Sequence, residues 1–288
     1  AILDLASWTT GHENGMGVQV NGTYGGMFYG SASLQQQDPN ASLEDEDGKD
    51  VNSYFMRGVF APIVSETEVL HFGLDYATRS YGNERDGTKF GGAISSNLGV
   101  RGINENNGLN SAALVLAPSD ASATAGNTTT GFESDDVVGL EFAYMTGPFS
   151  VQSEYLKRDL SGYGSNGDRK ATGYNMLLAY TLTGESRIYK LDGAKFDAIK
   201  PFDKVNGAWE LFYRYDNLNV EDDQTMATVG GVAVDESSAK VHTLGVNWYA
   251  NEAVKISASY LMSKSDEDTV KLQTGRSAAG DDDDSGKA

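Results

Sequence analysis

Apolar and polar residues alternate along much of this chain. In residues 207–218, GAWELFYRYDNL, one parity carries Trp209, Leu211, Tyr213 and Tyr215, and the other carries Glu210, Arg214 and Asp216. A period of two indicates a β-strand, because successive side chains of a strand point to opposite faces. The alternation leaves open whether the apolar face packs on a protein core or faces lipid.

The alternating segments come in pairs joined by short turns, and each pair predicts a β-hairpin. The four clearest pairs are 16–24 with 26–35, 52–63 with 68–79, 137–146 with 149–158, and 239–249 with 253–264. These segments have about 9–12 residues, the length of a tilted transmembrane strand, whereas globular strands usually have about 5–6. Short turns at one end and long polar stretches at the other are typical of outer-membrane barrels. The pattern therefore predicts an all-β protein, a transmembrane antiparallel β-barrel.

Composition narrows the class of protein further. The sequence has no apolar run long enough for a transmembrane helix, which needs about 20 residues. It has no Cys, so disulfides and thiolate metal sites are excluded. The net charge of -19 argues against nucleic-acid binding, which requires a basic surface.

Motifs for catalysis or metal binding are absent from the sequence. It contains no G-x-S-x-G elbow and no P-loop, and His12, His71 and His242 lack the spacing of metal ligands. We therefore expect no enzyme activity, no cofactor and no metal site, with His71 at a wetted polar position. The acidic runs at 43–50 and 281–284 are expected to be solvated loops, with weak Ca²⁺ binding as the alternative.

A long insertion interrupts the pairs at residues 80–135. Within it, 88–95 and 111–117 are candidate strands, and 118–136 is rich in small polar residues. An insertion of this length is usually functional or disordered. Folding into a lumen and lying on the surface both remain open.

Three sequence blocks carry a family resemblance: LTGESRIYKLDGAKFDAIKP at 182–201, NGAWELFYRYDNL at 206–218 and VHTLGVNWYANEAVKISASYLM at 241–262. In this order and spacing they resemble the phosphate-selective porin family (porins O and P). The resemblance implies a bacterial outer-membrane barrel of sixteen strands, usually trimeric, that passes anions such as phosphate. We count only about eleven or twelve candidate strands, and so we expect 1–288 to be a single barrel domain that lacks N-terminal strands and the closing C-terminal strand.

The alternation also assigns charged residues of both signs to the lumen face. The basic candidates for pore lining are Arg57, Arg79, Arg158, Arg214 and Lys255, and the acidic residues of the same face are Asp75, Glu141, Glu154, Glu210 and Asp216. The family is expected to line its pore with an Arg and Lys ladder, because phosphate needs charge-assisted donors. The two lists balance, so opposed ladders and paired charges are both open; we favour pairing for most of them.

The predicted function is that of an outer-membrane porin for passive diffusion of small anions, phosphate or polyphosphate. The expected partners are outer-membrane lipid, small anions and two further copies in a homotrimer. The alternatives are a general or cation-tolerant porin, a structural barrel partner in an envelope complex, and a soluble acidic β-sandwich that binds carbohydrate.

Overall fold

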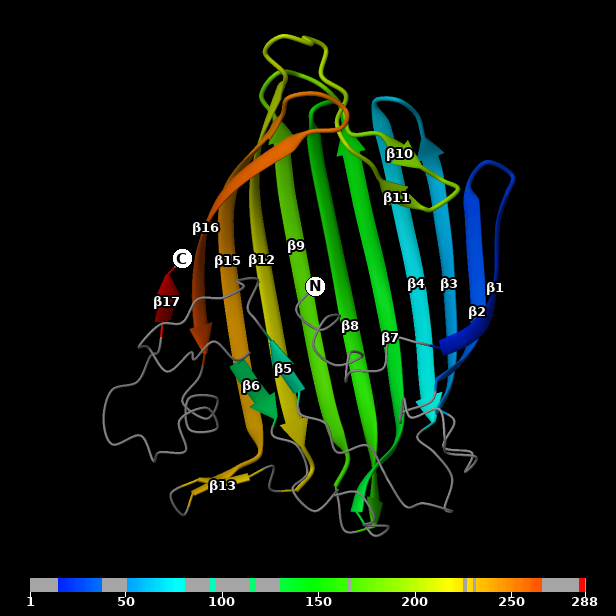
Figure 1. The fold of residues 1–288 in the computed structure, drawn as a ribbon, viewed down its shortest axis with the longest axis vertical. Coiled ribbons are helices and arrows are strands. Elements are labelled where there is room, and N and C mark those ends of the chain that lie inside the picture. Colours follow the sequence, from blue (N-terminus) through cyan, green and yellow to red (C-terminus); the bar gives the residue numbers. More distant parts are fainter. Residues whose placement is uncertain are drawn as a thin grey trace.

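Long antiparallel strands make up most of the structure. The computed structural model describes residues 15–37, 51–80, 94–96, 114–117, 130–164, 167–224, 227–229, 232–265 and 285–287. Eleven strands form one sheet in the order β1-β2-β3-β4-β7-β8-β9-β12-β15-β16-β17, and every neighbouring pair is antiparallel (Figure 1). Because these strands form one sheet, the alternative of a β-sandwich, which has two packed sheets, is wrong.

The ten long strands of the sheet have 10 to 17 residues, and β17 has three. Their bounds are β1 (Gly15–Tyr24), β2 (Phe28–Gln37), β3 (Val51–Val64), β4 (Glu68–Ser80), β7 (Thr130–Thr146), β8 (Phe149–Gly164), β9 (Arg169–Thr181), β12 (Ala208–Asp222), β15 (Glu236–Tyr249), β16 (Lys255–Ser265) and β17 (Ser285–Lys287). Several strands are longer than the sequence predicted. They extend past the apolar band, where both faces are polar and the alternation disappears, as in residues 133–136 of β7.

All four predicted hairpins are present, in β1–β2, β3–β4, β7–β8 and β15–β16. The turn between β7 and β8 shows why the short turns form where they do. Thr146 pairs with Phe149 across the two residues Gly147 and Pro148. Gly147 has a φ of 54°, which a residue without Cβ adopts at no steric cost, and its N–H donates to the carbonyl of Thr67 at 2.7 Å.

Three short two-stranded sheets lie outside the main sheet: β5 (Ile94–Ser96) with β6 (Leu114–Ala117), β13 (Ala227–Val229) with β14 (Val232–Val234), and β10 (Tyr189–Lys190) with β11 (Lys195–Phe196). The first pair overlaps the candidate strands of the insertion, and the rest of the insertion up to residue 129 lies outside the described residues. The β10–β11 pair belongs to the connection 182–207 between β9 and β12. Figure 1 shows this pair in front of β4 and β7.

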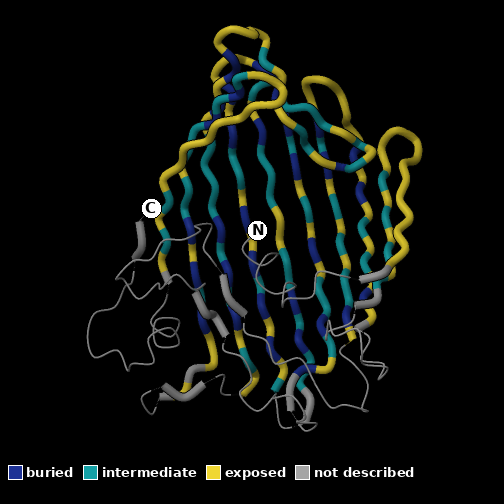
Figure 2. Tube along the Cα trace, in the orientation of Figure 1, coloured by how far each residue is buried: buried dark blue, intermediate teal, exposed yellow. Residues whose placement is uncertain are grey.

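Alternating burial gives the main sheet two different faces (Figure 2). Large apolar side chains are exposed on the outer face, including Trp209 at 43% and Leu211 at 46%. In-register aromatics cross neighbouring strands there: the rings of Phe72 and Phe142 lie 5.7 Å apart, and those of Trp209 and Trp248 lie 5.9 Å apart. The apolar face therefore does not pack on a protein core within the described structure.

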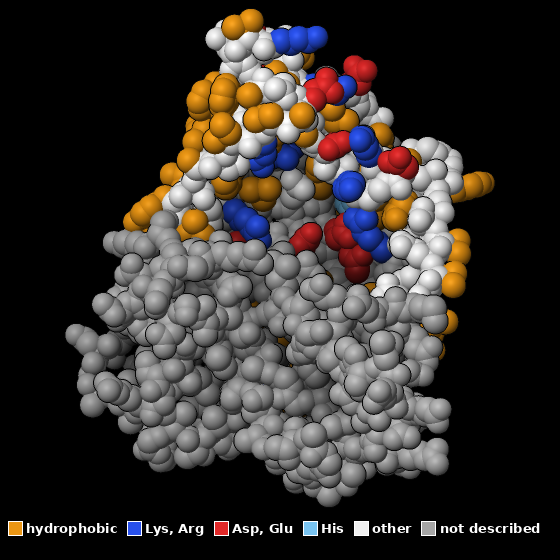
Figure 3. Space-filling view, viewed as in Figure 1, with side chains coloured by type: hydrophobic (Ala, Val, Ile, Leu, Met, Phe, Trp, Pro, Cys, Tyr) orange, Lys and Arg blue, Asp and Glu red, His pale blue; other side chains and the backbone are white. Residues whose placement is uncertain are grey.

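The opposite, inner face is hollowed, and charged side chains gather in the hollow (Figure 3). Its buried apolar clusters are small, one around Val59, Ala61 and Ala194 and another around Ile199, Ala208 and Tyr249. Polar contacts therefore carry much of the packing on this side. The part of the chain that the structure describes has no helix long and apolar enough to cross a membrane.

Candidate functional site

The strand register places all of the predicted pore-lining side chains on the inner face. Arg57 of β3 pairs with Asp75 of β4, so the two side chains share a face, and Arg79 lies four residues after Asp75 on that same face. Arg158 of β8 lies two residues after Leu156, which pairs with Gly173 of β9, so Arg158 has the same face as Leu156. Glu210, Arg214 and Asp216 are alternate residues of β12 and so share a face. Lys255 of β16 lies on the same face, because it pairs with Tyr249 of β15, which in turn pairs with Ala208 of β12. That these residues line a water-filled pore stays a prediction.

A row of four polar side chains crosses the centre of the inner face. Glu141 of β7 pairs with Glu154 of β8, Glu154 with Asn175 of β9, and Asn175 with Asp216 of β12. We call these four residues the acidic row. The Asn175 amide donates to Glu154 Oε2 at 2.9 Å, while Glu141 and Asp216 bind arginines.

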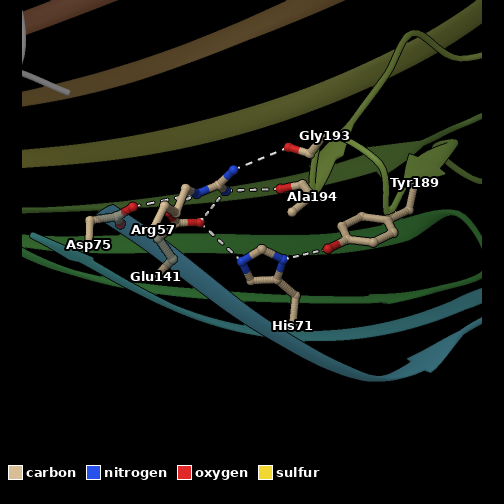
Figure 4. A network of polar contacts seen from close by, with 7 residues as sticks. All are labelled: Arg57, His71, Asp75, Glu141, Tyr189, Gly193 and Ala194. Carbon is tan, nitrogen blue, oxygen red and sulfur yellow. Dashed lines mark hydrogen bonds and ion pairs between the residues drawn. The ribbon is translucent and has the colours of Figure 1, made fainter. Parts of the chain in front are cut away.

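Arg57 binds the end of the acidic row and the β10–β11 hairpin together (Figure 4). Its Nε and Nη2 donate to the two carboxylate oxygens of Glu141, each at 2.7 Å. Its Nη1 and Nη2 donate to the carbonyls of Gly193 at 3.1 Å and Ala194 at 3.0 Å. Asp75 lies 3.4 Å from Nε. Four of the five N–H donors that a guanidinium carries are thus used within the protein.

His71 belongs to the same network, and its expected wetted position is wrong. Only 4% of it is exposed. Its Nε2 lies 3.0 Å from Glu141 Oε2, and its Nδ1 lies 2.7 Å from the Tyr189 hydroxyl. Because Nε2–H donates a hydrogen bond to the Glu141 carboxylate, Nδ1 is left to accept a hydrogen bond from the Tyr189 hydroxyl. Burial was unpredictable here because it comes from the connection 182–207, which is far from His71 in sequence.

Arginines near the long-loop end of the inner face are buried with aspartates. Arg158 and Asp135 make a bidentate ion pair in which Nε donates to Oδ1 at 2.7 Å, with side chains exposed by 2% and 0%. Arg169 Nε donates to Asp222 Oδ2 at 3.0 Å, and its guanidinium lies 5.0 Å from the Phe132 ring centroid. Burying such charges is tolerable only when they are paired and hydrogen-bonded.

Glu210 is fully buried at the short-turn end of the face. It accepts hydrogen bonds from Asn247 at 2.7 Å and from the Tyr249 hydroxyl at 3.4 Å, and Arg187 Nη2 lies 2.6 Å from its other oxygen. Lys255 is exposed, and its Nζ lies 5.5 Å from the centroid of the Tyr249 ring.

The remaining predicted residues divide by exposure. Arg214 keeps 38% of its side chain exposed and donates from Nε to Asp216 Oδ1 at 3.0 Å, whereas Asp216 is buried. Arg79 is buried, and its Nε donates to the Ser53 hydroxyl at 3.3 Å. The preference for paired charges is confirmed for Arg57, Arg158 and Arg214, whose ion pairs are all formed within the protein.

Sequence reasoning assigned no role to Glu185, Arg187 and Tyr189, although all three belong to the LTGESRIY block. Glu185 is buried and accepts the Phe202 N–H at 2.9 Å, which folds the connection back on itself. Arg187 binds Glu210 of β12, and Tyr189 binds His71 of β4. The available signal was the block itself: charged and aromatic residues concentrated in a connection that lies outside any alternating strand.

Two pKa effects belong to this connection. Burial raises the pKa of the Tyr189 phenol to about 12, so that the hydroxyl remains a protonated donor to His71. Lys190 and Asp197 form an ion pair in solvent, and their hydrogen bond raises the pKa of Lys190 and lowers that of Asp197. Both charges therefore persist across the ordinary pH range.

Among the described residues, no group of three or more His, Asp or Glu side chains is arranged to hold a metal ion. The acidic runs at 43–50 and 281–284 lie outside the described residues, so their predicted behaviour is not tested there.

The comparison with known protein families agrees with this two-faced sheet. The family model described as phosphate-selective porin O and P matches residues 1–280. The chain belongs to this family. It is also 45% identical over 279 residues to Porin O of Pseudomonas aeruginosa, a match that covers 93% of this chain and 60% of the relative.

As a member of the porin O and P family, the chain is a protein of the bacterial outer membrane, and its sheet is the wall of an antiparallel transmembrane β-barrel. In transmembrane barrels the apolar face of the sheet is the outer one and the polar face is the inner one. The family is one of channels rather than of enzymes. The chain spans 60% of the length of the relative that it matches.

Proposed function

We propose that this protein forms a water-filled channel through which small anions, phosphate among them, diffuse down their concentration gradients. The observation that carries the proposal is the division of the sheet into an exposed apolar outer face and a charged, hollowed inner face. Membership of the porin O and P family supports the anion as the permeant species. Such a channel works through the width and the fixed charges of its lumen, so we infer that it catalyses no reaction.

Among the predicted pore-lining residues, we assign direct contact with permeant ions to Arg214 and Lys255, which keep exposed surface. The buried Arg79, Arg158, Glu210 and Asp216 are assigned a supporting role, in which each fixes the position of a neighbour. This division rests on exposure, because a buried charge that is already paired has no free donor or acceptor for a passing ion.

A second candidate function is a channel that also admits cations. The observation in its favour is the acidic row, in which Glu154 is exposed and binds the neutral amide of Asn175. A wall with both signs of charge passes ions of both signs unless one sign dominates at the narrowest point.

The proposed assembly is a homotrimer in the outer membrane, with lipid around the outer face. The extensive exposed apolar surface supports lipid or protein contact, because soluble monomers rarely expose contiguous apolar patches of more than a few hundred Å².

Ion selectivity is the test of the proposal. The purified protein is inserted into planar bilayers, and reversal potentials are measured across a KCl gradient with and without inorganic phosphate. The anion channel predicts a reversal potential of anion-selective sign and a chloride current that phosphate reduces. A cation-selective potential without block by phosphate would establish the second candidate instead. A protein that stays soluble and monomeric without detergent would contradict both.

A further inference from the structure

The connection 182–207 is attached to the inner face at two separate places. Near its own strands, Leu182 N–H donates to the Trp209 carbonyl at 2.7 Å, and Arg187 binds Glu210. Ile199 is fully buried with Ala208 and Tyr249. These contacts hold the two ends of the connection at β9, β12 and β15.

The second attachment is at the far side of the hollow. The β10–β11 hairpin, residues 189–196, contacts β3 through Arg57 and β4 through His71, and both of these side chains bind Glu141 of β7 (Figure 4). Ala194 is buried in one cluster with Val59 and Ala61, and Tyr29, Tyr189 and Leu191 pack around it. The hairpin therefore lies against strands β3 and β4, which are five and four positions away from β12 in the sheet order.

The backbone of Ala194 indicates that this attachment is held under strain. Its φ is 46°, and among the described residues no other non-glycine has a positive φ. A residue with a Cβ adopts this conformation only where its surroundings over-determine it, because the Cβ comes close to a backbone carbonyl oxygen. Here the determining contacts are the burial of the Ala194 methyl and the hydrogen bond from Arg57 to its carbonyl.

The contacts of Arg57 explain why it is suited to hold a hairpin rather than an ion. Two of its donors are bound to Glu141 and two to hairpin carbonyls. Glu141 in turn is held by His71, whose other nitrogen binds Tyr189 on the hairpin. Arg57 and His71 thus each bind both the hairpin and Glu141, so two separate sets of hydrogen bonds connect the hairpin to the sheet.

We propose that Arg57, Glu141, His71 and Tyr189 form a latch that keeps the β10–β11 hairpin against the wall and out of the path of permeant ions. Arg57 is then a positioning residue rather than part of an anion-binding ladder. The effect of the latch on conduction rests on the channel function proposed above. The existence of the latch does not, because it concerns only the position of the hairpin.

The position of the hairpin is tested first, without any measurement of current. Residues 1–288 contain no Cys, so in this chain a spin label at Lys195→Cys, on the exposed side of β11, reports the hairpin alone. We expect slow motion of the spin label at residue 195 in the otherwise unchanged protein, and several-fold faster motion of the same label after Arg57→Gln. A label at Lys204→Cys, in the part of the connection next to β12, is the matched control and is expected not to change. Equal mobility at residue 195 with and without Arg57 would overturn the latch.

The consequence for conduction is tested by single-channel recording with a rescue. Arg57→Gln is expected to raise open-channel noise and brief closures several-fold, because the freed hairpin stays tethered inside the lumen. In the same variant, cysteines at Ala61 and Ala194 are joined by a short bifunctional methanethiosulfonate reagent, and the quiet current is expected to return. Persistent noise after cross-linking would mean that Arg57 acts through its charge and would contradict the latch.

Two further variants separate the latch from general effects. Arg214→Gln removes an inner-face arginine that binds Asp216 rather than the hairpin, so it is expected to shift ion preference without adding noise. Tyr189→Phe keeps the ring and removes the hydroxyl bound to His71, so it is expected to raise the label mobility less than Arg57→Gln does. This milder change keeps the latch testable if Arg57→Gln folds poorly. If no variant conducts, the channel proposal fails, and the spin-label result still decides the latch.

Discussion

Gly73 of β4 lies directly across from Glu141 of β7, and the Glu141 side chain occupies the space where a Cβ at residue 73 would be. A Cβ built there would lie 2.9 Å from Glu141 Cβ, Cδ and Oε2. The relationship repeats one step along: Asp75 pairs with Gly139, and its side chain lies 3.2 Å from the corresponding Cβ position. The two glycines make room for the two carboxylates that surround Arg57.

Gly73→Ala is therefore expected to displace the Glu141 carboxylate from Arg57 and His71. The loss of free energy of unfolding is expected to be about 1–3 kcal/mol, the usual cost of overpacking. Urea unfolding of the protein in detergent or lipid measures it. The matched control is Gly58→Ala on the neighbouring strand, where a Cβ meets nothing within 4 Å. Equal effects of the two changes would argue against a specific clash with Glu141.

Arg214→Glu is expected to lower the preference for anions, because Arg214 is partly exposed on the inner face and reversing its charge leaves Asp216 without its cation. Reversal potentials in a KCl gradient measure the change. Lys157→Glu makes the same change of charge on the outer face, where Lys157 pairs with Asp159 in solvent, and is expected to leave ion preference unaltered. An unchanged potential for Arg214→Glu would exclude it from the pore lining.

Leu211→Arg is expected to impair membrane assembly. Leu211 is 46% exposed on the outer face, between Tyr180 and Val246 of the neighbouring strands. An arginine on a lipid-facing position costs about 2–4 kcal/mol near the bilayer midplane. The yield of folded protein in vesicles, measured by its resistance to protease, tests this. Val205→Arg, in the exposed part of the connection, is the control and is expected to assemble normally. Normal assembly of Leu211→Arg would show that this side chain does not meet lipid.

Asp135→Asn is expected to destabilise the protein strongly, because it removes a charge that is paired with the buried Arg158 guanidinium. Removing one partner of a buried ion pair typically costs about 3–5 kcal/mol. Asp159→Asn breaks the exposed pair between Asp159 and Lys157, the two sequence neighbours of Arg158, and exposed pairs contribute about 0–1 kcal/mol. Unfolding midpoints of the two variants compare the pairs directly. Similar small shifts in both would mean that the Arg158–Asp135 pair contributes little.

Much of the fold was predictable from sequence because the signals involved are local. The period of two assigned Trp209 and Leu211 to one face and Glu210 and Asp216 to the other, and the structure places them so. Short Gly-containing turns identified hairpins such as β7–β8, since residues on both sides of a two-residue turn must pair. The sequence blocks at 182–262 pointed to the family.

Pairings across long insertions were not predictable in the same way. Strands β4 and β7 are neighbours although 49 residues separate Ser80 from Thr130, and β9 pairs with β12 across the connection 182–207. Alternation says which face a side chain takes but not which strand lies beside it, because any two amphipathic strands have compatible faces.

The sequence alone therefore determined the long strands of the hairpins, the two faces and which charged residues lie on the inner face, because each depends on neighbours a few positions apart. Only the tertiary structure decided that Arg57 binds Glu141 and the carbonyls of Gly193 and Ala194, and that His71 is buried beneath Tyr189. These contacts join residues 84 to 137 positions apart, and those with Tyr189, Gly193 and Ala194 form because the connection 182–207 folds back over the inner face. Alternation identified the charged residues of GAWELFYRYDNL, and the fold showed that Glu210 and Asp216 are buried in paired contacts while Arg214 keeps exposed surface.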